Sequence, residues 1–337
     1  MRALQLVDGI GLDNLKVLEV PDPKPGPGEV LVRMRAVSLN FRDLLMVGGV
    51  YGPQTPLPLT PFSDGCGVVE AVGEGVTRVA VGDRVSTLFF QKWFAGKPTM
   101  EGQMSALGLP IPGAGRELAV FSEQGVSKVP DYLSDHQVST LACAALTAWR
   151  ALFSDAHLEP GDTVLLQGTG GVSIFGLQFA KAAGYRTIIT SSSDEKLERA
   201  KALGADHVIN YRTTPEWGRA ARAITGGAGV DFVMEVGGAG TLTESLKAIA
   251  LMGHIAIIGV LAGAAEPLQI GTMIATGAKL QGVSVGSRAM FEAMCKALEL
   301  HRIEPVVDKV YPFTEAVAAF KAMQGGEHFG KIVLSFD

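Results

Sequence analysis

The chain has 337 residues, of which 47% are apolar and 19% are charged, a composition typical of a globular protein with a sizeable core. Its formal charge of −5, with no basic cluster, argues against nucleic acid or an anionic membrane surface as a partner. The three cysteines are too few and too scattered for a disulfide framework, which favours a reducing compartment. The charged residue Asp8 comes too early in the chain for a signal peptide. We therefore expect a cytoplasmic protein.

Short strands separated by glycine and proline are predicted over roughly the first 125 residues. The clearest strands are residues 29–34, 67–72 and 84–88. They indicate a β-rich, partly barrel-like region. Residues 91–115, which are rich in glycine and contain no cysteine, are expected to form a surface loop or lobe.

Strands and helices alternate from about residue 135 onwards. Continuous apolar strands that alternate with helices are typical of a parallel sheet covered on both faces. The fold class predicted is therefore α/β, with a doubly wound Rossmann sheet. The strands are expected at residues 163–167, 187–190, 207–209, 230–234 and 254–258, and the helices at 142–153, 174–183, 195–203, 216–224 and 242–250. A further helix (290–300) and a strand (331–336) follow.

Residues 248–265 carry no formal charge and approach the length of a membrane-spanning helix. Glycines interrupt this stretch at Gly253, Gly259 and Gly263. We interpret it as a helix end, a turn and a buried strand, and expect no membrane association.

A glycine-rich turn follows the strand at 163–167 and precedes a predicted helix. Glycine allows the backbone to turn tightly and to approach a pyrophosphate, and the helix N-terminus supplies unpaired N–H groups. The same glycines could also form an ordinary tight turn. The prediction of a dinucleotide site therefore depends on the strand that precedes the turn and the helix that follows it. The residues concerned are Gly168, Thr169, Gly170, Gly171 and Val172, and Ser173 stands where the motif has its third glycine.

The second strand of this alternating region ends in Ser191, Ser192 and Ser193, without the carboxylate that accepts from the ribose 2′-hydroxyl of NAD. Three hydroxyls and the nearby Lys196 suit the 2′-phosphate of NADP, which a carboxylate would repel. We therefore favour NADP(H) over NAD(H). The serines also fit as caps of the next helix, with Lys196 in solvent, and both interpretations can hold together.

The order of a β-rich half, a Rossmann unit and a return segment resembles the medium-chain dehydrogenase/reductase superfamily over essentially the whole chain. The resemblance implies a GroES-like catalytic domain at residues 1–134, a Rossmann domain at 135–284 and a catalytic return segment at 285–337. It is strongest to the zinc-free alcohol dehydrogenase-like proteins, next to the quinone oxidoreductases. The markers are residues 25–32, 36–43, 67–76, 81–85, 142–149 and 203–211.

Zinc alcohol dehydrogenases have a cysteine where this chain has Asn40, and a His-Glu pair where it has Ser63 and Asp64. At the third zinc-ligand position of those relatives, this chain still has a cysteine, Cys143. A catalytic zinc needs three protein ligands, which this set does not supply. The lobe that carries four cysteines in those relatives has none here, at residues 91–115. The resemblance therefore predicts no zinc, with Cys143 as a small buried residue.

Without a metal, the substrate must already be electrophilic, as quinones, enones and reactive aldehydes are, or a hydrogen-bond donor must polarise it. The resemblance implies that Asn40 orients the substrate and that Asp43 is a structural or relay residue. Tyr51 is implied as the proton donor, or as a structural aromatic at a glycine-rich turn, and Asp64 and Ser63 as polar lining. Further cofactor contacts are implied for Thr147, Tyr211, Gly237, Gly259, Val260, Gly330 and Lys331.

Three functions remain open at this point. The first is a zinc-independent, NADP(H)-dependent oxidoreductase acting on a small quinone, enone or aldehyde. The second is a metal-free alcohol dehydrogenase, and the third is a non-catalytic NADPH-binding structural or sensor protein. Residues 278–285 resemble the strand through which relatives pair their sheets, so we expect a homodimer or, as a pair of dimers, a tetramer.

Overall fold

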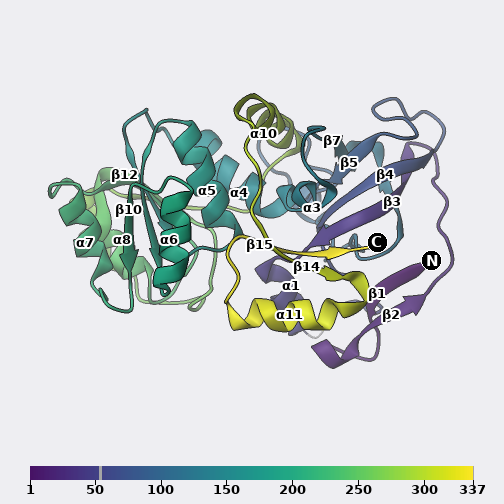
Figure 1. Cartoon of the computed structure of the whole chain (residues 1–337), viewed down its shortest axis with the longest axis horizontal. Helices are drawn as coiled ribbons and strands as arrows, with labels where there is room; N and C mark the ends of the chain where they lie inside the picture. The colour runs from purple at the N-terminus through teal and green to yellow at the C-terminus, as the bar shows by residue number, and fades with distance from the viewer. Residues whose placement is uncertain (53–54, 337) are drawn as a thin grey trace. The chain divides into compact units, whose positions relative to one another are not determined.

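A computed structural model describes residues 1–52 and 55–336. The chain forms two compact units, shown in Figure 1. The first combines Met1–Leu146 with Val285–Asp337, and the second is Thr147–Ser284. The second unit therefore begins inside the helical segment that follows residue 134, because the start of that segment packs on β3 and β4 of the first unit.

The first unit is built on a mixed sheet, which in the described residues has seven strands. Its order is β14-β15-β3-β4-β5-β7, and β6 also pairs with β3. The strands are β3 (Glu29–Ser38), β4 (Asp64–Val72), β5 (Arg84–Thr87), β6 (Leu118–Ser122), β7 (Val126–Lys128), β14 (Val307–Pro312) and β15 (Lys331–Ser335). A separate antiparallel pair consists of β1 (Arg2–Leu6) and β2 (Leu15–Glu19).

The core of this unit lies between the sheet and the C-terminal helix α11 (Ala316–Gly325), where Phe62 stacks on Phe320 with the ring centroids 5.7 Å apart. The segment 91–115 is only partly the surface lobe expected, because Leu107 and Ala114 contribute to this core. The other helices are α1 (Phe41–Val47), α2 (Met100–Gln103), α3 (Asp135–Val138) and α10 (Arg288–His301).

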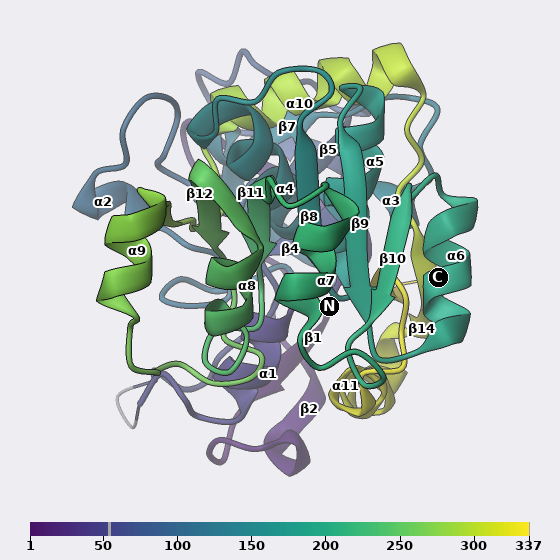
Figure 2. The same ribbon diagram turned by 90° about the vertical axis from the view of Figure 1, so that its left-hand side faces the viewer.

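The second unit is a doubly wound parallel sheet, as predicted. Its strand order is β10-β9-β8-β11-β12-β13, with all pairings parallel. Figure 2 shows these strands side by side from β10 to β12, with α7 and α8 in front of them. The strands are β8 (Thr163–Gln167), β9 (Arg186–Ser191), β10 (His207–Asn210), β11 (Val230–Glu235), β12 (Ile249–Ile257) and β13 (Lys279–Gly282).

Both faces of this sheet are covered because its strands carry apolar side chains on both sides. Trp217 and Leu246 pack on one face, and on the other the helix that follows β8 places Phe179 against Trp149, with the ring centroids 5.6 Å apart. The helices are α4 (Leu146–Trp149), α5 (Gly171–Ala182), α6 (Asp194–Ala202), α7 (Trp217–Ile224), α8 (Leu242–Ala248) and α9 (Ile270–Thr276).

Two predicted elements differ from the structure. The helix expected at 142–153 contains wide π-helical turns at Leu141–Ala145 and Arg150–Asp155 on either side of α4. The strand expected to begin at 254 begins at Ile249, because α8 ends at Ala248 and an exposed Met252 with φ 62° lets the chain continue as a strand. In the described residues, no helix is long and apolar enough to cross a membrane.

Candidate active site

The glycine-rich turn connects β8 to α5 in the second unit. Gly168 has φ 72°, a left-handed conformation that glycine adopts without strain, and Gly170 precedes the first residue of α5. A Cβ atom at either glycine would meet no atom within 4 Å, so the surface beside the turn is open. Thr169 is buried, and Gly171 and Val172 open the helix. The turn therefore offers unpaired N–H groups and space for a phosphate.

Close packing between α5 and the sheet depends on a glycine that the motif did not indicate. A Cβ at Gly176 would lie 2.9 Å from Sδ of Met234 and 3.0 Å from Cδ2 of Leu166. Ser173, at the third position of the motif, is buried and its hydroxyl donates to the carbonyl of Gln167 at 2.5 Å. The serine thus links the helix to the strand, while Gly176 allows their close approach.

The second strand of this sheet, β9, ends at Ser191, which is buried and whose hydroxyl accepts from the N–H of Ser193 at 3.3 Å. The hydroxyl of Ser193 caps α6. The nearest carboxylate, Asp194, lies in the first turn of α6 and accepts from Asn210 at 2.6 Å. The N–H of Tyr211 donates to the carbonyl of Ser191, which places Tyr211 beside the strand end. No carboxylate therefore ends β9, and Ser192 and Lys196 follow it within one turn.

A buried carboxylate that sequence reasoning missed organises the end of β11. Glu235 is fully buried, and its Oε1 accepts from the N–H groups of Gly237 and Gly238 at 2.9 and 3.0 Å. Its Oε2 accepts from Nε2 of Gln167, the last residue of β8, at 2.6 Å. This network fixes the turn at Gly237, next to the turn at Gly259 and Val260 that follows β12.

The first unit holds a buried polar cluster at the start of α1. Asn40 is the N-cap residue, and its N–H donates to Oδ2 of Asp43 at 2.8 Å, half of a capping box. Asp43 is fully buried, and its second oxygen, Oδ1, has no hydrogen-bond partner. The capping contact therefore orients both side chains toward the interior of the unit.

Asp64, the first residue of β4, is also fully buried. Its Oδ1 accepts from the hydroxyl of Ser63 at 2.7 Å, and its Oδ2 accepts from the N–H of Cys143 at 3.1 Å. Phe62, directly before this pair, has φ 74° and is held by hydrogen bonds from the 113–115 segment to residues 60–62. The strained backbone at Phe62 turns the chain so that Ser63 and Asp64 face inward.

Lys331, at the start of β15, belongs to the same cluster. Its Nζ donates to the carbonyl of Leu39 and, at 2.6 Å, to Oδ1 of Asn40. An ammonium group has no acceptor, so it must face the oxygen of the amide, and this fixes the orientation of the Asn40 side chain. The Asn40 Nδ2 is then buried without a hydrogen-bond partner of normal geometry, although the amide lies close enough to lower the pKa of Asp64.

Burial dominates the electrostatics of these groups. It raises the pKa of Asp43 to about 6, against the lowering influence of Arg42 and of the Asn40 N–H. It also raises the pKa of Asp64, opposed mainly by Lys331, and lowers the pKa of Lys331, opposed mainly by Asp64. Cys143, expected to be buried, is a partly exposed residue, and desolvation raises the pKa of its thiol far above the ordinary value, so it remains protonated at neutral pH.

We expect the Asp43→Asn variant to flatten the pH dependence of stability between about pH 4 and pH 6. The folded state holds the Asp43 proton more tightly than the unfolded state, so wild-type stability falls as pH rises through this window. A rise in pKa from 3.8 to about 6 corresponds to about 3 kcal/mol in the free energy of unfolding. Urea unfolding at several pH values measures the slope, with Asp13→Asn, at an exposed position, as control. An unchanged slope in Asp43→Asn would contradict the assignment.

The structure places the other predicted residues as follows. Tyr51 is 49% exposed on the turn after α1, and in the described part of the chain its hydroxyl makes no hydrogen bond, so no contact joins it to the cluster. Thr147 is buried within α4, and Gly330 precedes Lys331 with φ 84°. Lys331, for which a cofactor contact stays a prediction, has its amine buried against Asn40, a contact that no sequence pattern indicated.

The donor set of this cluster does not fit a zinc ion. Both oxygens of Asp64 already accept hydrogen bonds, and the Asn40 oxygen faces an ammonium group. Zinc requires deprotonated or neutral ligands with free lone pairs and no adjacent cation. Within residues 1–52 and 55–336, no three His, Cys, Asp or Glu side chains are grouped closely enough to hold a metal ion.

A Rossmann unit with an open glycine turn, joined to a β-rich unit with a buried polar cluster, defines a two-domain nicotinamide-dependent oxidoreductase. Residues 26–131 match the alcohol dehydrogenase GroES-like domain family, and residues 171–299 match the zinc-binding dehydrogenase family. With a relative at 44% identity over nearly its full length, the chain belongs to the medium-chain dehydrogenase/reductase superfamily.

Three similar proteins illustrate this family. A zinc-type alcohol dehydrogenase-like protein of Schizosaccharomyces pombe is 44% identical over 97% of this chain and 96% of its own. The crystal structure of an NAD-dependent alcohol dehydrogenase is 34% identical, covers 100% of both chains and superposes with a TM-score of 0.93. A mycobacterial protein whose structure contains NADPH is 29% identical, covers 99% of both chains and has a TM-score of 0.84.

Proposed function

We propose that this protein is a zinc-independent, NADP(H)-dependent oxidoreductase that transfers hydride to an activated quinone, enone or aldehyde. The observation that carries the proposal is the Asn40 side chain, which Lys331 holds by its oxygen and whose buried Nδ2 makes no hydrogen bond of normal geometry and lies near Asp64. A fixed, buried N–H donor of this kind stabilises negative charge that develops on a carbonyl or quinone oxygen.

The chemistry follows from what these side chains can do. A neutral amide N–H polarises a carbonyl oxygen less strongly than a metal ion does. It therefore suits substrates that are already electrophilic. The nicotinamide, when bound, supplies the hydride. Asn40 orients the substrate oxygen, and Asp43, with a pKa of about 6 and an unpartnered Oδ1, can hold or release a proton near neutral pH. Tyr51, whose exposed side chain carries a phenolic hydroxyl donor, is a second candidate for delivering the proton.

An assay of purified protein tests this function. NADPH oxidation with a naphthoquinone or methyl vinyl ketone is expected to persist after dialysis against EDTA and not to rise on addition of zinc. The Asn40→Ala variant should lose roughly 100-fold in kcat while binding NADPH normally, because one donor to the developing oxyanion is removed. Asn14→Ala, at a surface asparagine that bonds its own loop, is the matched control. Strict zinc dependence, or full activity in Asn40→Ala, would refute the proposal.

A preference for NADPH is proposed on the absence of a carboxylate at the end of β9 and on the hydroxyls of Ser191 and Ser192. The Ser192→Asp variant is expected to bind NADPH at least roughly tenfold more weakly, because a carboxylate there repels the 2′-phosphate. Its affinity for NADH should change little or improve. Fluorescence titration with both cofactors measures the ratio, and an unaltered NADPH/NADH ratio would remove these serines from the cofactor site.

A metal-free alcohol dehydrogenase is the second candidate, favoured by the alcohol dehydrogenase-like relatives. The same polarised oxygen would serve an aldehyde in one direction and its alcohol in the other. Alcohol-dependent reduction of NADP⁺ without reduction of the enone would favour this candidate. Tight binding of NADPH with no turnover of any substrate would instead indicate a structural or sensor protein.

We also propose a homodimer, or a tetramer made of two dimers, in the cytoplasm. Strand β13 lies at the edge of the parallel sheet, where a second copy can extend the sheet. The three cysteines are all free thiols, which agrees with a reducing compartment. Light scattering of the purified protein measures the mass directly, and a monomer at micromolar concentration would contradict the dimer.

A further inference from the structure

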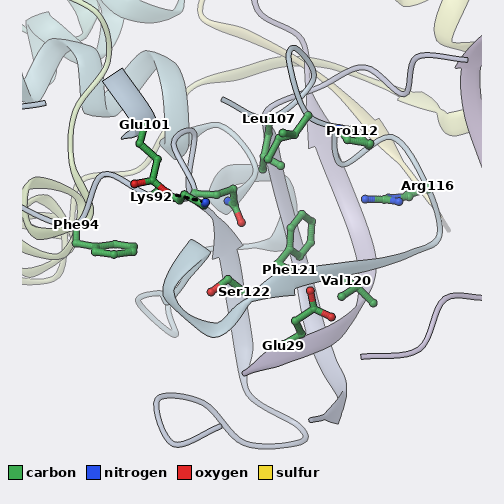
Figure 3. A pocket seen from close by; sticks show the side chains of 12 residues that line it. Glu29, Lys92, Phe94, Glu101, Leu107, Pro112, Arg116, Val120, Phe121 and Ser122 are labelled. Atoms are coloured by element: carbon green, nitrogen blue, oxygen red, sulfur yellow. Dashed lines mark hydrogen bonds and ion pairs between the residues drawn. The ribbon is translucent and has the colours of Figure 1, made fainter. Parts of the chain in front are cut away.

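A pocket of 490 Å³ lies in the first unit, away from the buried polar cluster. Its size falls in the range of small-molecule sites. Leu107, Ile111 and Phe121 line its apolar part, and Figure 3 shows Leu107 and Phe121 between the Lys92–Glu101 pair on one side and Arg116 on the other. The pocket therefore combines an apolar wall with a positive charge at one end.

Arg116 differs from the other charged residues of this pocket. Its Nε is buried without a hydrogen-bond partner, and within residues 1–52 and 55–336 no carboxylate forms an ion pair with it. Burial lowers its pKa, and no neighbouring acid offsets this effect. Partial burial of a guanidinium group without a counter-charge costs free energy, and a bound anion that pairs with the group offsets this cost.

Three carboxylates of this region, at the next residue and in the pocket lining, have other hydrogen-bond or ion-pair partners. Glu117, the next residue, pairs with Arg2 at 2.6 Å. Glu101 pairs with Lys92 at 2.8 Å, and Glu29 accepts from the N–H of Gly26 at 2.9 Å. No carboxylate of the described residues forms an ion pair with Arg116, so an anion from solution can take that place.

We propose that this pocket binds a small monocarboxylate with a short apolar chain, its carboxylate on Arg116 and its chain along Leu107, Ile111 and Phe121. A guanidinium group matches the two oxygens of a carboxylate in a bidentate pair. A dianion such as phosphate is disfavoured because Lys92 is committed to Glu101, and Glu29 and Glu101 both line the same pocket. The pocket's lining residues include neither the glycine turn nor the buried polar cluster, so the inference goes beyond the proposed oxidoreductase function.

Calorimetric titration of NADPH-saturated protein with octanoate tests the proposal, with octanamide and inorganic phosphate as comparison ligands. Octanoate should bind at submillimolar concentration, and octanamide and phosphate much more weakly. The Arg116→Gln variant should weaken octanoate binding at least roughly tenfold, because a charge-assisted bidentate pair is lost. Arg116→Lys should be intermediate, and Lys92→Gln, in the same pocket, should stay within about twofold of wild type.

Thermal unfolding supplies the folding control. Arg116→Gln removes an unpaired charge, so its melting temperature should equal or exceed that of the wild type. Octanoate should raise the melting temperature of the wild type and of Lys92→Gln but not of Arg116→Gln. Equal binding of octanoate and octanamide, undiminished binding of octanoate to Arg116→Gln, or no binding of octanoate at millimolar concentration would overturn the proposal.

Discussion

Replacement of Lys331 by methionine is expected to lower the free energy of unfolding by about 3–5 kcal/mol at neutral pH, and to reduce turnover sharply. The Nζ of Lys331 donates to Leu39 and Asn40, and its charge offsets the buried carboxylate of Asp64. Methionine fills a similar volume but leaves that charge uncompensated and the Asn40 amide free to rotate. Urea denaturation and steady-state kinetics of the variant measure both effects.

The pH dependence separates the lost charge from the lost hydrogen bonds. At acidic pH Asp64 is protonated more readily without its cation, so Lys331→Met should lose less stability at pH 5 than at pH 8. Lys331→Gln, which can still donate to Asn40, should recover part of the turnover but not the stability at pH 8. Equal stability losses at both pH values would show that packing, and not charge, explains the contribution of Lys331.

Glu235→Ala is expected to destabilise the protein by about 3–5 kcal/mol and to weaken NADPH binding, because several buried donors lose their acceptor. Glu235 accepts from two backbone N–H groups, from Gln167, and from the hydroxyls of Thr241 and Ser245. These contacts hold the turn at Gly237 beside the ends of β8 and β11. Differential scanning calorimetry, with and without NADPH, measures the loss.

Two variants serve as controls for this prediction. Glu235→Gln keeps one acceptor oxygen, but its amide N–H groups face the hydrogen-bond donors that the second oxygen accepts from in the wild type. Its melting temperature should therefore lie between those of Glu235→Ala and the wild type. Glu198→Ala, which removes an exposed carboxylate paired with Lys201, should melt like the wild type. A Glu235→Ala protein as stable as Glu198→Ala would mean that water replaces the carboxylate.

The sequence predicted the Rossmann unit well, because its signals are local. Apolar runs of strand length alternate with amphipathic helices, and the turn at Gly168 stands between β8 and α5. The serine end of β9 and the residue types at Asn40 and Asp64 could also be read from the sequence, since each depends on one position. The prediction that no zinc binds there stays a prediction. Boundaries were less accurate where packing decided them, as at Ile249, where a strand follows the helix without a loop.

The contacts that organise both sites could not be predicted, because they join residues distant in sequence. Nζ of Lys331 meets an asparagine 291 positions away, and Glu235 meets Gln167 across 68 positions. Neither residue lies in a motif, and a buried lysine or glutamate is indistinguishable from an exposed one in a single sequence. The unpaired state of Arg116 is equally invisible, since it depends on Glu117 and Glu101 having other partners.

The position of β15 has a consequence for the synthesis of the protein. This strand lies between β14 and β3 inside the first sheet, yet it follows every other strand of the described residues in sequence. On the ribosome, β3 and β4 emerge early, the whole parallel sheet follows, and only then does Lys331 reach Asn40. Until that moment residues 36–38 of β3 lack their partner on this edge, while residues 29–33 of the same edge already pair with β6. A ribosome stalled before residue 331 would therefore hold a first unit whose sheet lacks β15.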